Sequence, residues 1–295
     1  MIKLVLSDMD ETLKRANEPL VPKRTLKAIT ALKEAGIDFG PATGRSAYDA
    51  LPFYGFDARY LQTAVCGSGK VVYGKGALVA KRVLSTKTLE RILQVIARYK
   101  DTYLAYFDEG PAEPPLDVSI RPAWMIFGVT QAQVDYINAH YDSFTTAQGP
   151  NTVPHDKDFI SVGILAPQDR LAREAMFDDV LTQIPEIDLV SPYTGWYDVN
   201  PKGFSKADGF KILLEYLNLA PDEVVFCGDS GNDLTLLELS PHSFCVGNGS
   251  DEAKAAATYT LNGTVDEEIV ARLMEALVAD GGDISGPHVQ ALIER

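Results

Sequence analysis

Short apolar segments alternate with helix-length amphipathic segments at both ends of this 295-residue chain. Near the start, the apolar run 2–6 is followed by a loop and by an amphipathic segment that begins near Pro22 and ends at Gly36. A short continuous apolar run is typical of a strand that is buried on both faces. Because strands that alternate with helices form parallel sheets, both ends of the chain predict an α/β fold with a Rossmann-like parallel sheet.

The other elements expected in this sheet follow the same alternation. The predicted strands are 37–42, 60–66, 223–227 and 243–246, and the predicted helices are 46–54, 205–217, a helix from Asp233, and 266–278. A short helix near 289–293 is expected in the tail after Val278. We expect the two groups of strands to form a single sheet, although more than 100 residues separate them.

The middle of the chain has a different pattern, which predicts an inserted α+β domain. Segments 70–73 and 78–84 flank a Gly-Lys-Gly turn and are typical of a hairpin. Beyond them, helices are expected at 86–99, 131–141 and 167–184, and strands at 102–107, 120–129, 159–165 and 187–190. The sequence thus predicts a discontinuous core, 1–82 and 191–295, with an insert at 83–190.

Charge and cysteine content restrict the partners and the compartment. The chain has 27 Lys and Arg against 41 Asp and Glu, a net charge of −14, which argues against nucleic acid and anionic membranes as partners. Its three cysteines are widely spaced and odd in number, so neither a disulfide framework nor a zinc site is expected. The sequence has no signal-peptide pattern and no apolar run of membrane-spanning length, which predicts a cytoplasmic protein.

The first candidate motif, Asp8-Met9-Asp10-Glu11-Thr12-Leu13, follows the opening strand directly. Ligands of open α/β sheets bind at the carboxyl ends of the strands. Two carboxylates held there can divide the work, because one can attack phosphorus while the other transfers a proton to the leaving oxygen. An isolated Asp-x-Asp pair also caps turns, so this motif indicates phosphoryl chemistry only in combination with the other motifs.

The second and third motifs supply groups that suit a phosphate. Thr43, in Pro41-Ala42-Thr43-Gly44-Arg45, also follows a predicted strand, although a Thr-Gly pair is common in turns. Lys206 stands near the start of a predicted helix, where a cation is unfavourable unless an anion lies beside it. Lys202 competes for this role, but we prefer Lys206 because Lys202 precedes a glycine and is expected in a loop.

The fourth motif, Gly228-Asp229-Ser230-Gly231-Asn232-Asp233, follows a predicted buried strand. It offers two carboxylates and an amide, which are oxygen ligands of the kind that Mg²⁺ prefers, although it also suits a capped turn before a helix. At one sheet edge, the clustered carboxylates of the first and fourth motifs would repel by about 4 kcal/mol per close pair at an effective dielectric near 20. The combination therefore predicts a bound cation.

Together, these four motifs resemble those of the haloacid dehalogenase superfamily, specifically the Cof-type phosphatases with a large α/β cap. The resemblance extends to Val246-Gly247-Asn248-Gly249 and covers nearly the whole chain, and the insert 83–190 would be the cap, which selects the substrate. It implies Asp8 as nucleophile and Asp10 as general acid and base. The phosphate-binding residues it implies are Thr43, Gly44, Arg45, Lys206 and Asn232, and the Mg²⁺ ligands are Asp8, Asp10 (through its carbonyl), Asp229 and Asp233.

Two positions depart from the pattern of the family. Glu11 stands where most relatives have glycine, and Gly67-Ser68-Gly69 stands where they carry Asn-Gly. Glu11 adds a carboxylate near the predicted site and is expected to alter the turn. Neither departure removes a catalytic atom, but both are expected to influence substrate preference.

The expected function is hydrolysis of a small phosphorylated metabolite, most typically a sugar phosphate, through an aspartyl phosphate on Asp8, by a monomer or homodimer. Asp10 disfavours a dehalogenase, because halide release needs neither an acid nor a metal. Two alternatives stay open: a phosphomutase, which uses the same carboxylates, and a catalytically idle protein that binds a phosphometabolite. Nucleotide, flavin and pyridoxal phosphates are also possible ligands.

Overall fold

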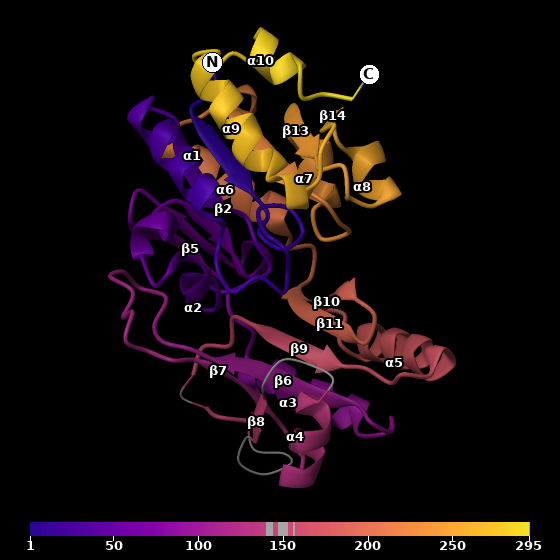
Figure 1. Ribbon diagram of the computed structural model, residues 1–295. Coiled ribbons are helices and arrows are strands. Elements are labelled where there is room, and N and C mark those ends of the chain that lie inside the picture. Colours follow the sequence, from indigo (N-terminus) through magenta and orange to yellow (C-terminus); the bar gives the residue numbers. More distant parts are fainter. Residues whose placement is uncertain (140–143, 147–152, 156, 295) are drawn as a thin grey trace. The chain divides into compact units, whose positions relative to one another are not determined.

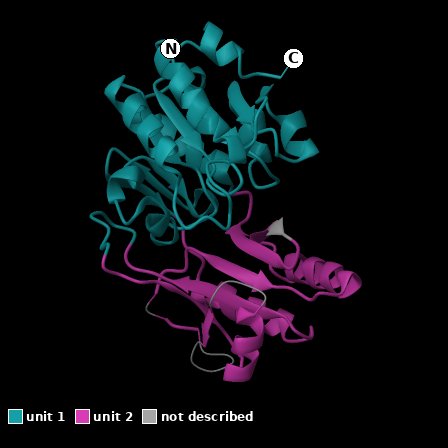
Figure 2. Ribbon diagram, in the orientation of Figure 1, with its two compact units in different colours: residues 1–81, 112–118, 205–295 teal, residues 82–111, 119–204 magenta. Residues whose placement is uncertain are grey.

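The structure, a computed structural model, describes residues 1–139, 144–146, 153–155 and 157–294 (Figure 1). Contacts divide the chain into two compact units (Figure 2). The first comprises Met1–Lys81, Ala112–Val118 and Ser205–Arg295, and the second comprises Arg82–Pro111 and Ser119–Phe204. The two segments of the second unit are thus separated in sequence by Ala112–Val118, which belongs to the first unit. That the core carries the catalytic site and that the insert selects the substrate both stay predictions.

The first unit is built on a parallel five-stranded sheet, which is the predicted Rossmann-like core. Its strand order is β14 (Tyr259–Thr260), β13 (His242–Cys245), β12 (Val224–Gly228), β1 (Leu4–Ser7) and β2 (Asp38–Pro41). Ser7 at the end of β1 pairs in register with Cys227 and with Pro41. The central strands thus end at the same level, so the segments that follow them emerge together.

Helices cover this sheet, whose neighbouring strands β12 and β1 are fully buried. Leu4 and Leu6 of β1 share an apolar cluster with Phe210, while α1 and α9 pack against each other. The helices are α1 (Lys23–Glu34), α6 (Lys206–Leu217), α7 (Leu234–Leu239), α8 (Asp251–Ala256) and α9 (Ile269–Ala279). Val5 of β1 is as buried as Leu4 and Leu6. This burial on both faces explains the apolar run at 2–6, in which Lys3 is the one polar residue.

A small antiparallel sheet follows, with the order β3 (Ala64–Cys66), β4 (Val71–Gly74) and β5 (Ala77–Lys81). It contains the predicted hairpin. The predicted strand 60–66 is wrong in its first part, because Asp57 caps a 3₁₀ turn at Ala58–Leu61 and β3 begins only at Ala64. Its expected place in the parallel sheet is also wrong, because β3 pairs antiparallel with β4 and meets the end of β2 through the isolated bridge of Ala42 with Val65. The predicted helix 46–54 is split into α2 (Ala47–Ala50) and a 3₁₀ turn that contains Pro52, whose ring nitrogen cannot donate a helical hydrogen bond.

The second unit contains a six-stranded mixed sheet with helices. Its strand order is β10 (Ile187–Tyr193), β11 (Trp196–Pro201), β9 (Val162–Leu165), β6 (Tyr103–Asp108), β7 (Ala123–Ile126) and β8 (Phe144–Thr146). The helices are α3 (Thr86–Ile96), α4 (Gln131–Asn138) and α5 (Arg170–Gln183). The end of the predicted helix 131–141 lies outside the described residues. An α+β arrangement was predicted for this part of the chain.

Strand β11 was not predicted, because its polar residues and final proline conceal the strand pattern. Trp196 is nevertheless buried, and its indole nitrogen donates to Asp198 at 2.7 Å. A Cβ atom at Gly163 of the neighbouring β9 would lie 2.0 Å from the Trp196 ring. The large ring on one strand is thus accommodated by a missing side chain on the next, a pairing that no local pattern reveals.

The tail after α9 belongs to the first unit, as α9 does. The short helix α10 (Pro287–Gln290) occupies the region where one was predicted, and Leu261 forms a β-bridge with Ile293. In the described part of the chain, no helix combines the length and the apolar character needed to span a membrane.

Gly69 connects the small sheet to α6. Gly67, Ser68 and Gly69 all have positive φ, of 59°, 56° and 96°, and form a buried turn after β3. A Cβ atom on Gly69 would lie 2.1 Å from the carbonyl oxygen of Ser205, the N-cap of α6. This turn and the start of α6 are therefore in direct backbone contact.

We expect Gly69→Ala to lower the free energy of unfolding by about 3–5 kcal/mol, because strain at positive φ adds to a clash with backbone atoms. Gly36→Ala is the matched control. Gly36 also has a positive φ, of 80°, but a Cβ atom added there would meet no neighbouring atom within 4 Å, so only the φ strain of about 1–2 kcal/mol applies. Urea unfolding of both variants measures the difference, and equal losses would contradict the contact with Ser205.

Candidate active site

The predicted site residues of the first unit come together at the carboxyl ends of the parallel strands. Asp8 follows β1, Thr43 lies just beyond β2, and Asp229 follows β12. Lys206 is the first residue of α6, and Asp233 is the N-cap of α7. Because β1 lies between β12 and β2, these separate motifs share one edge of the sheet.

Lys206 is buried between two carboxylates. Its Nζ donates to Oδ1 of Asp8 and to Oδ1 of Asp233, each at 2.7 Å, and its side chain has no exposed area. Burial lowers the pKa of a lysine, but the two carboxylates overcome this effect and the pKa of Lys206 is raised. Lys202, the competing candidate, belongs to the second unit and pairs with Asp188 at 2.6 Å.

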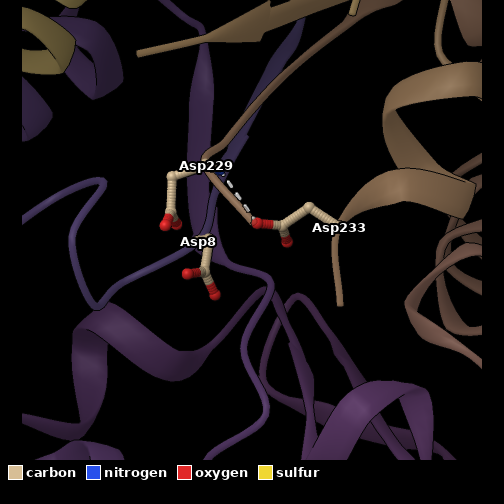
Figure 3. Close-up of side chains that lie close together, drawn as sticks. All are labelled: Asp8, Asp229 and Asp233. Atoms are coloured by element: carbon tan, nitrogen blue, oxygen red, sulfur yellow. Dashed lines mark hydrogen bonds between the residues drawn. The ribbon is translucent and has the colours of Figure 1, made fainter. Parts of the chain in front are cut away.

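Three carboxylates gather around this ammonium group. Asp8, Asp229 and Asp233 each place one carboxylate oxygen within 4.8 Å of the others (Figure 3). Burial raises the pKa of Asp8 well above its usual range, against the effect of Lys206, and Asp233 and Asp229 raise it further. Burial and the charge of Asp233 raise the pKa of Asp229 to about 7.

The cluster holds more negative than positive charge. Three carboxylates face one ammonium group, and carboxylate oxygens are the ligands that hard divalent cations prefer. Thr12 donates its hydroxyl to Oδ1 of Asp229 at 2.8 Å, which orients this carboxylate. The donor set therefore fits a divalent cation such as Mg²⁺.

Asp233 also shapes the turn that carries Asp229. Its Oδ2 accepts the backbone N–H of Asp229 at 3.0 Å (Figure 3). It also accepts the backbone N–H of Ser230 at 3.3 Å. A Cβ atom on Gly228 would lie 2.8 Å from Cγ of Asp233, so this close approach requires glycine. Asn232 accepts a hydrogen bond from the Ser230 hydroxyl at 3.1 Å and belongs to the same turn.

Asp10 has a different environment from Asp8. Arg45 donates to its Oδ2 through Nε at 2.6 Å and to its Oδ1 through Nη2 at 3.2 Å, and Lys14 donates to Oδ1 at 3.0 Å. Burial by itself raises the pKa of Asp10, but Arg45 and then Lys14 reverse this effect, so the pKa is lowered. The two carboxylates of the first motif thus have opposite pKa shifts.

The loop that carries Thr43 is fixed by its own hydrogen bonds. Thr43 is buried, and its Oγ1 accepts the backbone N–H of Arg45 at 3.1 Å, across the partly exposed Gly44. The N–H groups of Gly67 and Ser68 donate to the carbonyls of Arg45 and Thr43, at 2.8 and 3.0 Å. Arg45, a predicted phosphate-binding residue, pairs with Asp10 and, at 3.0 Å, with Asp49.

Glu11 keeps the backbone conformation that glycine favours, with φ of 60°. Its carboxylate accepts from Arg15 at 2.5 Å and from the N–H of Ala16 at 2.8 Å. The side chain of Asn248 donates to the Glu11 carbonyl at 2.7 Å and accepts the N–H of Val265 at 2.8 Å. Glu11 thus preserves a left-handed turn and directs its charge to Arg15.

Sequence reasoning assigned no role to three residues that support the acidic motifs: Thr12, Lys14 and Asn248. Thr12 stands inside the first motif and Asn248 lies between two glycines, so both positions carried a local signal. Lys14 carried none, because a lysine next to a motif is ordinarily solvated.

The chain is similar to known proteins over most of its length. A sequence model of the family described as haloacid dehalogenase-like hydrolase matches residues 5–274. The 5-amino-6-(5-phospho-D-ribitylamino)uracil phosphatase YbjI of Escherichia coli is 24% identical over 270 residues, which cover 88% of this chain and 90% of that protein.

Solved structures of similar fold cover almost the whole chain. BT1666 of Bacteroides thetaiotaomicron, described among the phosphatases of the haloalkanoate superfamily, has a TM-score of 0.73 at 22% identity and covers 96% of both chains. The subclass IIB sugar phosphatase BT4131 has a TM-score of 0.69 at 19% identity and covers 92% of this chain and 98% of that one. These likenesses confirm the predicted fold class.

We expect Lys206→Met to lower the free energy of unfolding by about 3–5 kcal/mol at neutral pH, because it leaves buried carboxylates without their cation. The loss is smaller near pH 5. Removing Lys206 raises the already elevated pKa of Asp8 further, so the folded state binds a proton that the unfolded chain lacks, and stability falls as the pH rises.

Lys202→Met is the matched control for this prediction. The Lys202 side chain is 63% exposed, and loss of its surface pair costs less than about 1 kcal/mol. Urea unfolding at both pH values measures the two variants. A loss for Lys206→Met that does not depend on pH would contradict the electrostatic explanation.

Proposed function

The chain belongs to the haloacid dehalogenase-like hydrolases and is a phosphatase of that family, and we propose that it hydrolyses a small phosphorylated metabolite through an aspartyl phosphate on Asp8, with Mg²⁺. The observation that carries this proposal is the contrast between two carboxylates of one loop. Asp8 is buried beside Lys206 and two further acids, whereas Asp10 is partly exposed and held by Arg45 and Lys14. One carboxylate suits nucleophilic attack, and the other suits proton transfer.

In the first half of the proposed reaction, a carboxylate oxygen of Asp8 forms a bond to phosphorus as the bond from phosphorus to the leaving oxygen breaks. The electron pair stays on the leaving oxygen, which takes a proton from Asp10. Lys206 stabilises negative charge at the phosphoryl group, and the Thr43 loop provides polar groups toward it. The negative charge of a bound phosphate favours the protonated carboxyl of Asp10 that this step requires.

In the second half, water attacks the phosphorus of the aspartyl phosphate and gives a proton to Asp10. The bond between phosphorus and the Asp8 oxygen breaks, which regenerates the Asp8 carboxylate and releases inorganic phosphate. The ionised form of Asp10, favoured by Arg45 and Lys14, is the form that accepts this proton. One residue therefore serves both halves of the reaction.

We propose that the Mg²⁺ ion is held by the carboxylates of Asp8 and Asp229 and by the carbonyl of Asp10. Asp233 orients the turn that carries Asp229, and it also orients Lys206. Bound there, the ion neutralises phosphoryl oxygens and supplies the charge that the acidic cluster lacks. Thr43, Gly44, Arg45 and Asn232 are retained as proposed phosphate-side residues.

A sugar phosphate is the substrate class that we propose, with the second unit selecting the leaving group. This choice is supported by the likeness to BT4131, which is named a sugar phosphatase. YbjI, by contrast, is named for a phosphorylated ribitylaminouracil. A panel of sugar, nucleotide, flavin and pyridoxal phosphates decides between these leaving groups.

Hydrolysis of 4-nitrophenyl phosphate tests the proposed function directly. We expect Mg²⁺-dependent release of inorganic phosphate by the unaltered protein and a loss of at least about 10³-fold in Asp8→Asn, because an amide cannot form the covalent intermediate. Turnover that is unaffected in Asp8→Asn contradicts the mechanism. Phosphoryl transfer to an added sugar phosphate, without release of phosphate, indicates a mutase.

Thr12→Val tests the proposed metal ligand Asp229. Removing the hydroxyl that donates to this carboxylate is expected to weaken Mg²⁺ binding by about 10-fold, the lower end of the range for residues that orient metal ligands. Thr12→Ser retains the hydroxyl and serves as the control. Titration of Mg²⁺ against thermal stability and activity measures both variants, and equal Mg²⁺ affinity in Thr12→Val and Thr12→Ser would contradict this role.

A further inference from the structure

Lys14 is a lysine whose side chain has no exposed area, although it lies in a loop. Its Nζ donates to Asp10 Oδ1 at 3.0 Å and to the carbonyls of Arg15 and Ala16 at 2.8 and 3.4 Å, and lies 4.2 Å from the centre of the Phe53 ring. A buried ammonium group is tolerated only when its N–H groups have partners, and here they have three acceptors and an aromatic face.

Lys14 is built into the same loop as Asp10. Asp10 and Lys14 form a β-bridge, the N–H of Glu11 donates to the Lys14 carbonyl at 2.7 Å, and the N–H of Lys14 donates to the Met9 carbonyl at 3.0 Å. The backbone and the side chain of Lys14 therefore both fix the position of Asp10. The loop and its carboxylate form a single hydrogen-bonded unit.

Arg45, the second cation on Asp10, differs from Lys14 in two respects. Its side chain is 22% exposed, and it divides its bonds between Asp10 and Asp49. Arg45 holds Oδ2 of Asp10 through its Nε, whereas Lys14 bonds only Oδ1. An anionic substrate can therefore reach Arg45, and a displaced Arg45 leaves Oδ2 free while Lys14 still holds Oδ1.

We propose that Lys14 is the positioning residue of the general acid. It fixes Asp10 through Oδ1 and the loop backbone, so that Oδ2 is directed to exchange a proton with the leaving oxygen once Arg45 contacts the substrate. Lys14 acts through Asp10 and does not contact the reacting atoms. This inference rests on the proposed function, in which Asp10 protonates the leaving group.

The test compares 4-nitrophenyl phosphate with phenyl phosphate, two substrates of similar shape whose leaving groups differ in basicity. Phenolate is the more basic and depends more on protonation by Asp10. The value of kcat/KM reports the steps up to release of the phenol, so the later hydrolysis of the aspartyl phosphate does not affect it. The ratio of the two kcat/KM values therefore measures general-acid catalysis.

In Lys14→Met we expect kcat/KM to fall about 30-fold for phenyl phosphate and less than about 3-fold for 4-nitrophenyl phosphate, since general acids contribute about 10²–10⁴-fold in total. Lys14→Arg restores a cation and is expected to return the ratio of the two values towards that of the unaltered protein. Lys27→Met, which removes an exposed lysine of α1, is the matched control and leaves both values unchanged.

Equal losses for the two substrates in Lys14→Met, or no loss for either, would overturn the proposal. If circular dichroism shows that Lys14→Met does not fold, Lys14→Gln, whose amide still donates to the loop carbonyls, is measured for the same ratio and decides in its place. Failure of the proposed function looks different, because the unaltered protein then turns over neither substrate, or Asp8→Asn turns over both.

Discussion

The active-site edge of the sheet depends on one buried ammonium group. Lys206 joins Asp8, at the end of β1, to Asp233, at the start of α7, and both bonds are 2.7 Å long. Water does not reach this lysine, so the interaction is weakly screened and the groups must stay in contact. The position of α6 relative to the central strands is therefore coupled to the charge state of the site.

Two neighbouring carboxylates are given different properties by the cations around them. Asp8 shares Lys206 with Asp233 and lies near Asp229, so burial and like charge raise its pKa. Asp10 receives hydrogen bonds from both Arg45 and Lys14, and its pKa is lowered. Two residues apart in sequence, they belong to two electrostatic environments because Asp8 contacts Lys206, whereas Asp10 contacts Arg45 and Lys14.

Much of the sheet was predictable because burial on both faces leaves a simple pattern. The strands β1 and β12 are largely apolar and end at turn residues, and the structure places both of them, and also β13, within one or two residues of the predicted bounds. Strand β11 was missed because its polar residues and final proline conceal the strand pattern, and because the burial of Trp196 depends on Gly163 of the neighbouring strand. The residues Ala112–Val118 belong to the first unit through contacts such as that of Tyr73 Oη with the Ala112 carbonyl at 2.8 Å, which no local pattern encodes.

By itself, the sequence determined the family, the parallel sheet and the residues that reach its carboxyl edge, because strand ends are local features and parallel strands end together. It also favoured Lys206 over Lys202 as the phosphate-binding lysine, because Lys206 stands near the start of a predicted helix whereas Lys202 precedes a glycine. Only the tertiary structure decided which cation pairs with which carboxylate. Hydrogen bonds between residues far apart in sequence, such as that of Arg45 with the Asp10 carboxylate or that of Asn248 with the Glu11 carbonyl, depend on how the loops fold against one another.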